Sequence, residues 1–142
     1  MIYLDTGCLV KLYYPEADSA SVAAAVFGKV IIYSSLHDLE LKNALSLKVF
    51  QGRASLEQVA AVKSLIIADL NAGLLRRMNP DWERTSSLAV DISAQHTPKV
   101  GCRSLDILHC AQAKLTQAEA FLTTDARQLA VATAMGMPLL SS

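Results

Sequence analysis

Short apolar segments alternate with longer helix-forming segments along this chain, and that alternation limits its fold more than any other feature. The segments expected to form strands are residues 2–4, 29–33, 74–78, 120–123 and 137–140. The segments expected to form helices are residues 6–13, 19–27, 35–50, 56–72, 80–94, 104–115 and 126–135. Strands that alternate with helices build a parallel sheet with helices on both faces. A length of 142 residues suits one domain, so we predict a single α/β domain over residues 1–142.

Polar residues and helix breakers give these helices their expected ends. Asp18 is suited to cap the second helix, and Ser34 or Ser35 the third. Ser55, followed three residues later by a glutamine, resembles a capping box. Proline at position 80 suits the first turn of a helix, and residues 96–104, HTPKVGCRS, are expected to form a loop.

The composition excludes several classes of protein. Hydrophobic residues make up 52% of the chain and charged residues 18%, which favours a folded core over disorder. The sequence has no uninterrupted apolar run of about 18 residues, and it lacks a basic start followed by an apolar stretch. We therefore expect neither a membrane span nor secretion. The three cysteines form no disulfide framework, so a cytoplasmic location is expected.

Two carboxylates lie just after expected strands, and two others lie near the starts of expected helices. Asp5 follows residues 2–4, and Asp125 follows the apolar stretch AFLTT. Glu40 and Asp106 fall within the first turns of their helices. In open α/β sheets, ligands bind outside the carboxyl ends of the strands. Taken singly, each acid has an ordinary alternative role, as a helix cap, a partner of the helix dipole or a solvated side chain.

Four carboxylates in one pocket repel one another. Two of them ~4 Å apart repel by about 4 kcal/mol at an effective dielectric constant near 20. Such a group therefore needs protons or cations. Oxygen ligands without matching histidine or cysteine suit Mg²⁺ or Mn²⁺. A metal ion held in this way can activate water and bind a phosphodiester.

The order and context of these acids resemble the PIN-domain nucleases, especially the VapC-type toxins of bacterial toxin–antitoxin pairs. The matching motifs are YLDTG at Asp5 and Thr6, LHDLELKNAL at Glu40, DILHCAQA at Asp106, and LTTD at Thr123 and Asp125. The four motifs occur in the family's order and span nearly the whole chain. The resemblance implies a PIN-like α/β/α sandwich with a short central parallel sheet of four or five strands.

The resemblance also implies an activity and partners. The activity is that of an endoribonuclease that depends on Mg²⁺ or Mn²⁺ and hydrolyses RNA phosphodiester bonds. The metal-binding acids would be Asp5, Glu40, Asp106 and Asp125, and the hydroxyls of Thr6 and Thr123 would orient the acids or a metal-bound water. The expected partners are an RNA substrate, a second copy of the chain in a homodimer, and a cognate antitoxin whose tail reaches the acidic pocket.

Two departures from the family pattern leave an alternative open. Thr124 stands where the family often has asparagine or another polar residue, and the stretch ARQLAVA after Asp125 lacks the further acid that many members carry. A second metal site is therefore expected to be weak or to fill only with substrate. The alternative function is a catalytically inactive PIN-fold module that binds RNA or protein. A haloacid-dehalogenase-type phosphotransferase is disfavoured because Gly7 stands where that class needs a second aspartate.

The basic and histidine residues give weaker indications. Setting aside the four acids leaves 13 basic and nine acidic residues, a balance suited to RNA phosphates. Arg103 is the residue expected nearest the scissile phosphate, with a solvated loop arginine as the alternative. His109 is expected to be half-buried on its helix, and His37 near the surface. A zinc site is disfavoured because the spacing C-x6-H-C around His109 matches no known ligand pattern.

Overall fold

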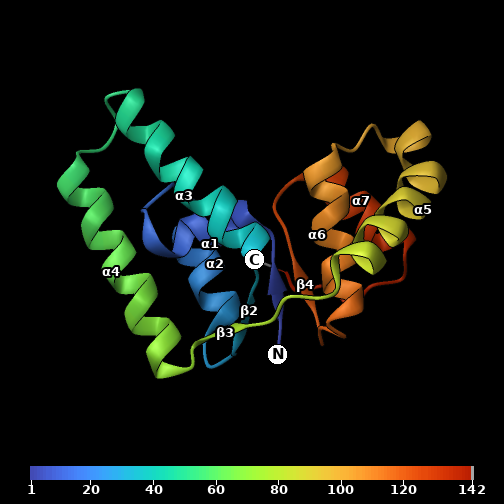
Figure 1. Cartoon of the computed structure of the whole chain (residues 1–142), viewed down its shortest axis with the longest axis horizontal. Helices are drawn as coiled ribbons and strands as arrows, with labels where there is room; N and C mark the ends of the chain where they lie inside the picture. Colours follow the sequence, from blue (N-terminus) through green and yellow to red (C-terminus); the bar gives the residue numbers. More distant parts are fainter. Residues whose placement is uncertain (142) are drawn as a thin grey trace.

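The computed structural model describes residues 1–141, which form seven helices and four strands (Figure 1). In chain order these are β1 (Tyr3–Leu4), α1 (Thr6–Tyr13), α2 (Ser19–Val26), β2 (Ile31–Tyr33), α3 (Ser35–Phe50), α4 (Leu56–Ala72), β3 (Leu75–Arg77), α5 (Trp82–Val100), α6 (Ser104–Leu115), β4 (Phe121–Leu122) and α7 (Ala126–Ala134). Within these residues, none of the helices combines the length and the apolar character needed to cross a bilayer.

The strands form a short parallel sheet. β1 pairs with β4, and β2 pairs with β3. A parallel bridge between Ile2 and Ile31 joins the two pairs, and another between Phe121 and Leu139 extends the edge. The strand order is therefore β3-β2-β1-β4, with Leu139 as the last position. This confirms the predicted parallel sheet, in which the fifth predicted strand is reduced to one bridge.

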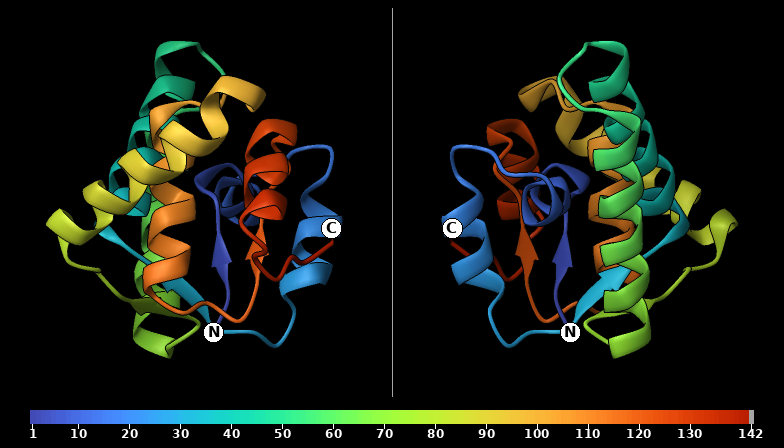
Figure 2. Two further views of the ribbon diagram at one scale, coloured as in Figure 1. Left: turned by 90° about the vertical axis from the view of Figure 1, so that its right-hand side faces the viewer. Right: turned by 90° about the vertical axis from the view of Figure 1, so that its left-hand side faces the viewer.

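Helices cover both faces of the sheet, so the predicted α/β/α architecture is confirmed. Side chains on a strand alternate between faces, and the buried residues follow this rule. Leu4 and Ile31 pack against α1–α4, whereas Tyr3 and Ile32 pack against α5–α7. Figure 1 shows the two groups of helices on either side of the strands, and Figure 2 shows β1 and β4 side by side and pointing the same way.

The predicted loop over residues 96–104 was wrong in its first half. Helix α5 continues to Val100 and includes Pro98. A proline has no N–H, so α5 lacks the bond that residue 98 would donate to the carbonyl oxygen of residue 94, yet the helix continues for two more residues. The helix ends instead at Gly101, which has φ 69° and occupies the left-handed conformation typical of a helix terminus.

The expectation that His37 lies near the surface was also wrong. His37 is fully buried on α3, where its Nε2 bonds to the Leu4 carbonyl oxygen at 2.8 Å and its Nδ1 accepts from the Ser34 N–H at 3.0 Å. Both ring nitrogens of His37 therefore have hydrogen-bond partners within the protein. Burial, reinforced by the nearby His109, lowers the pKa of His37 to about 3, so the ring is neutral at pH 7.

Candidate active site

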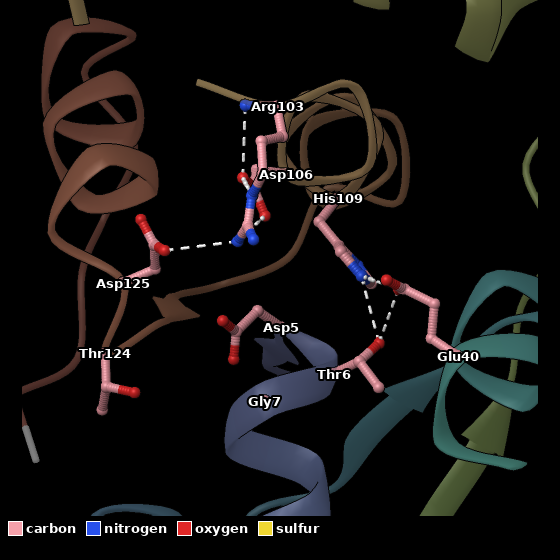
Figure 3. Close-up of a pocket in the computed structure, with 9 residues that line it drawn as sticks. All are labelled: Asp5, Thr6, Gly7, Glu40, Arg103, Asp106, His109, Thr124 and Asp125. Carbon is pink, nitrogen blue, oxygen red and sulfur yellow. Dashed lines mark hydrogen bonds and ion pairs between the residues drawn. The ribbon is translucent and has the colours of Figure 1, made fainter. Parts of the chain in front are cut away.

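A hollow of about 350 Å³ opens at the carboxyl ends of β1 and β4 (Figure 3). It is lined by residues from three helices, α1, α3 and α6, and from the segments that precede α1, α6 and α7: Asp5, Thr6, Gly7, Glu40, Arg103, Asp106, His109, Thr124 and Asp125. All four acids singled out in the sequence thus lie around one space, together with Thr6 and Arg103. Thr123 lies just behind the hollow and contacts Asp5.

Asp5 is held firmly at the end of β1. Its side chain is largely buried, with 8% of the residue exposed. Its Oδ1 accepts from the Cys8 N–H at 2.7 Å, which caps α1, and its Oδ2 accepts from the Thr123 hydroxyl at 3.0 Å. The helix-cap role considered for Asp5 is therefore present, and the same carboxylate also faces the hollow.

Asp125 combines the same two features at the start of α7. Its Oδ1 accepts from the backbone N–H groups of Arg127 at 2.9 Å and Gln128 at 3.0 Å. The hydrogen bond from the Gln128 N–H, and to a lesser extent the one from Arg127, lowers the pKa of Asp125 below its usual value. These bonds outweigh the partial burial of the carboxyl group, which acts to raise the pKa. The backbone N–H of Asp125 donates to the Thr123 hydroxyl, which in turn donates to Asp5. Thr123 thereby ties the two strand-end acids together.

Glu40 enters the hollow from α3, on the side of Asp5 opposite to Asp125 (Figure 3). Its Oε2 accepts from the Thr6 hydroxyl at 2.8 Å and lies 2.5 Å from Nε2 of His109. Burial acts to raise the pKa of Glu40, but the hydrogen bond and charge of His109, with the bond from Thr6, outweigh it and lower this pKa. Glu40 is therefore a carboxylate at pH 7.

The guanidinium group of Arg103 contacts both Asp106 and Asp125. Nε of Arg103 lies 2.9 Å from Asp106 Oδ2, and its Nη2 lies 3.4 Å from Asp125 Oδ2. The arginine side chain is 65% exposed, so its hold on the acids is screened by water. Arg103 therefore lies across the mouth of the hollow and partly offsets the repulsion between these two carboxylates.

The family comparison decides the classification. The profile described as PIN domain matches residues 2–134. This chain belongs to the PIN domain family. The predicted resemblance is thereby confirmed, and with it the fold class.

Solved structures support the same fold for this PIN domain. It is similar to FitAcB from Neisseria gonorrhoeae, with a TM-score of 0.68 and 17% identity over 99% of this chain and 97% of that one. It is also similar to VapC20 from Mycobacterium tuberculosis, described as a sarcin-ricin loop cleaving toxin, with a TM-score of 0.68 and 14% identity over 96% of each chain. At these identities the likeness concerns the fold. A search of curated protein sequences gave no match.

The donor set of this PIN domain suits a hard divalent cation. As arranged in residues 1–141, no three acidic, histidine or cysteine side chains surround a common point. Three of the four acids are instead in contact with Arg103 or His109. The groups that face the hollow are nevertheless mainly carboxylate and hydroxyl oxygens, the ligands that Mg²⁺ and Mn²⁺ prefer. The residues fit such an ion in chemistry and in charge.

Sequence reasoning missed His109 as part of the site. The structure buries it to 2% exposure and places it in the lining of the hollow, in contact with Glu40 and with Thr6 at 3.1 Å. The signal was present in DILH, because residues i and i+3 lie on the same face of a helix. His109 follows Asp106 by three positions and so faces the same hollow.

Proposed function

We propose that this PIN domain is an endoribonuclease that depends on Mg²⁺ or Mn²⁺ and hydrolyses RNA phosphodiester bonds, acting as the toxin of a type II toxin–antitoxin pair. The observation that carries the proposal is the convergence of Asp5, Glu40, Asp106 and Asp125 on one hollow. These acids come from segments far apart in the chain, and their mutual repulsion favours a divalent cation.

In this proposal the four acids hold the metal. A bound divalent ion would lower the pKa of a water molecule and offset charge on the phosphate oxygens. The hydroxyl of Thr123 keeps Asp5 turned toward the hollow, and the hydroxyl of Thr6 does the same for Glu40. Because these partners are already hydrogen-bonded, the acids are oriented before substrate arrives.

Arg103 is proposed as the residue that contacts the scissile phosphate. Its side chain reaches across the mouth of the hollow from the start of α6 and is exposed enough to move. A guanidinium group can bind a phosphate through two parallel hydrogen bonds. Release of Asp106 and Asp125 by Arg103 would then free both acids for the cation as RNA enters.

The proposed partners are RNA, a second copy of the chain and an antitoxin. VapC20, which shares the fold, is described as a toxin that cleaves the sarcin-ricin loop. Large apolar side chains on α3 and α4 are exposed, among them Phe50 at 87% and Leu56 at 76%. Exposed apolar side chains of this size suit contacts with other chains. We place the complex in the cytoplasm.

The test is cleavage of labelled RNA by purified, antitoxin-free protein. We expect cleavage with Mn²⁺ or Mg²⁺, none when EDTA is present in excess, and recovery when Mn²⁺ is added back. Cleavage that persists in EDTA would reject the metal-dependent mechanism.

A catalytically inactive binding module is the second candidate. The observation that favours it is the stretch after Asp125, where Arg127 and neutral residues replace the further acid of many family members. This candidate predicts that the protein binds RNA or a partner protein but cleaves no RNA with any divalent ion. Gel-shift and cleavage assays on the same RNA separate the two functions.

A further inference from the structure

We infer that His109, held in place by Tyr3, is a positioning residue that fixes the carboxylate of Glu40 in the acidic hollow. The inference rests on the proposed function, because it names a residue on which that site depends. His109 acts through Glu40, and its own contacts are with protein side chains.

The contact between His109 and Glu40 determines which carboxylate oxygen faces the hollow. Nε2 of His109 lies 2.5 Å from Oε2 of Glu40, and the Thr6 hydroxyl donates to the same oxygen at 2.8 Å. A carboxylate oxygen with two hydrogen bonds to protein is fully engaged. The other oxygen, Oε1, is then the one left to meet a cation or a water molecule.

The second ring nitrogen of His109 is also hydrogen-bonded within the protein. Its Nδ1 is hydrogen-bonded to the hydroxyl of Tyr3 at 2.9 Å, and that hydroxyl also donates to Oε1 of Gln112 at 2.9 Å. The Ser34 hydroxyl donates to the same Gln112 oxygen at 2.7 Å. Tyr3 is fully buried, so this chain of polar groups runs through the core and ends at Glu40.

Ring packing limits the movement of His109. The ring centres of His37 and His109 are 5.1 Å apart, and those of Tyr3 and His109 are 5.7 Å apart. Tyr3 also packs against His37, at 4.7 Å. Close-packed rings of this kind hold one rotamer, so Nε2 keeps a fixed position relative to the hollow.

The contact also joins two parts of the molecule that the sheet separates. Glu40 lies on α3 and His109 on α6, which Figure 1 shows on opposite sides of the strands. Asp106 lies three residues before His109 on the same helix. Fixing Glu40 to His109 therefore also fixes the distance between two of the proposed metal ligands.

The first test measures RNA cleavage by His109→Leu, His109→Gln and the same changes in a Glu40→Gln background. Groups that orient metal ligands usually change activity 10- to 100-fold when removed, so His109→Leu should lower kcat by about that factor with little change in KM. His109→Gln keeps an N–H donor and should lose less than about 10-fold. In the Glu40→Gln background, His109→Leu should change kcat by no more than about twofold.

A matched pair of tyrosine variants controls for loss of stability. Tyr3→Phe removes the hydroxyl that holds His109, and Tyr13→Phe removes one that donates to Asp69 on α4, where neither Tyr13 nor Asp69 lines the hollow. We expect Tyr3→Phe to lower kcat and Tyr13→Phe to leave it unchanged, with folding checked by thermal unfolding of each variant. An equal effect of His109→Leu with and without Glu40→Gln would overturn the inference.

The second test needs neither RNA nor metal. The ring N–H proton of His109 is followed by NMR in the wild type, Glu40→Gln, Tyr3→Phe and Asp91→Asn, the last being an exposed acid on α5. We expect a strongly downfield signal that moves in the first two variants and stays in Asp91→Asn. If the wild type cleaves RNA but the chemical shift of this proton is the same in Glu40→Gln as in the wild type, the inference about His109 fails while the proposed nuclease activity stands. If no RNA is cleaved, the nuclease proposal fails and the NMR result alone decides the positioning of Glu40.

Discussion

Asp5→Asn is expected to lower the rate of RNA cleavage by more than about 100-fold while the protein remains folded. Groups that merely orient a metal ligand change activity by about 10- to 100-fold, and Asp5 is proposed to be a ligand itself. The substitution removes the negative charge and one strong oxygen donor from the most buried acid of the hollow. The measurement is cleavage of labelled RNA with saturating Mn²⁺.

The fold should survive this change because asparagine caps helices as well as aspartate does. An amide oxygen can accept from the Cys8 N–H, and the amide nitrogen can donate to the Thr123 hydroxyl. We expect similar thermal unfolding midpoints for Asp5→Asn and the wild type. Asp91→Asn, which changes an exposed acid on α5 in the same way, is the matched control and should cleave normally. Wild-type cleavage by Asp5→Asn would remove Asp5 from the mechanism.

The second large effect is a loss of stability as pH falls below about 6.5, caused by His37. Its pKa is about 3 in the folded protein against 6.5 as a free side chain. The unfolded state therefore binds a proton between these pH values and the folded state does not. Stability is fully present above pH 6.5 and falls by up to about 1.4 kcal/mol for each pH unit below it.

Urea unfolding between about pH 7 and pH 5 measures this slope. His37→Gln should be less stable at pH 7, because it loses buried contacts, but its stability should decline less steeply over that range. Glu40 and Asp125 act at lower pH. Their pKa values are lowered by folding, so the stability they contribute is present above their usual pKa values and is lost as pH falls through the folded ones. Equal slopes for wild type and His37→Gln would contradict the assignment.

The fold could be predicted to a large extent because its signals are local. Short apolar segments predicted the strands, and the cap at Ser34 and the capping box at Ser55 are both present in the structure. Prediction failed at Pro98 and at His37. Pro98 was expected to lie in a loop, but α5 continues through it and ends at Gly101, where the left-handed backbone conformation stops the helix. His37 is buried because β1 offers the Leu4 carbonyl oxygen as a partner, which the sequence around it does not reveal.

The four acids that line the hollow could be grouped from the sequence, but His109 and the contacts between the lining residues could not. Strand ends and helix starts share one edge of a parallel sheet, so the acids could be grouped from their positions alone. The sequence could not show that Asp5 is helix cap and site residue at once. Nor could it show the contact of His109 with Glu40, because that contact depends on how α3 and α6 lie across the sheet. The bridging of Asp106 and Asp125 by Arg103 depends on tertiary structure in the same way.

Titration calorimetry with Mn²⁺ tests the central claim, that the acids of the hollow together hold a divalent ion. Binding to the wild type and to Asp91→Asn should be equal, and binding to Asp5→Asn should be at least about 10-fold weaker. Equal Mn²⁺ affinity of the wild type and Asp5→Asn, or no binding to the wild type at all, would contradict the account.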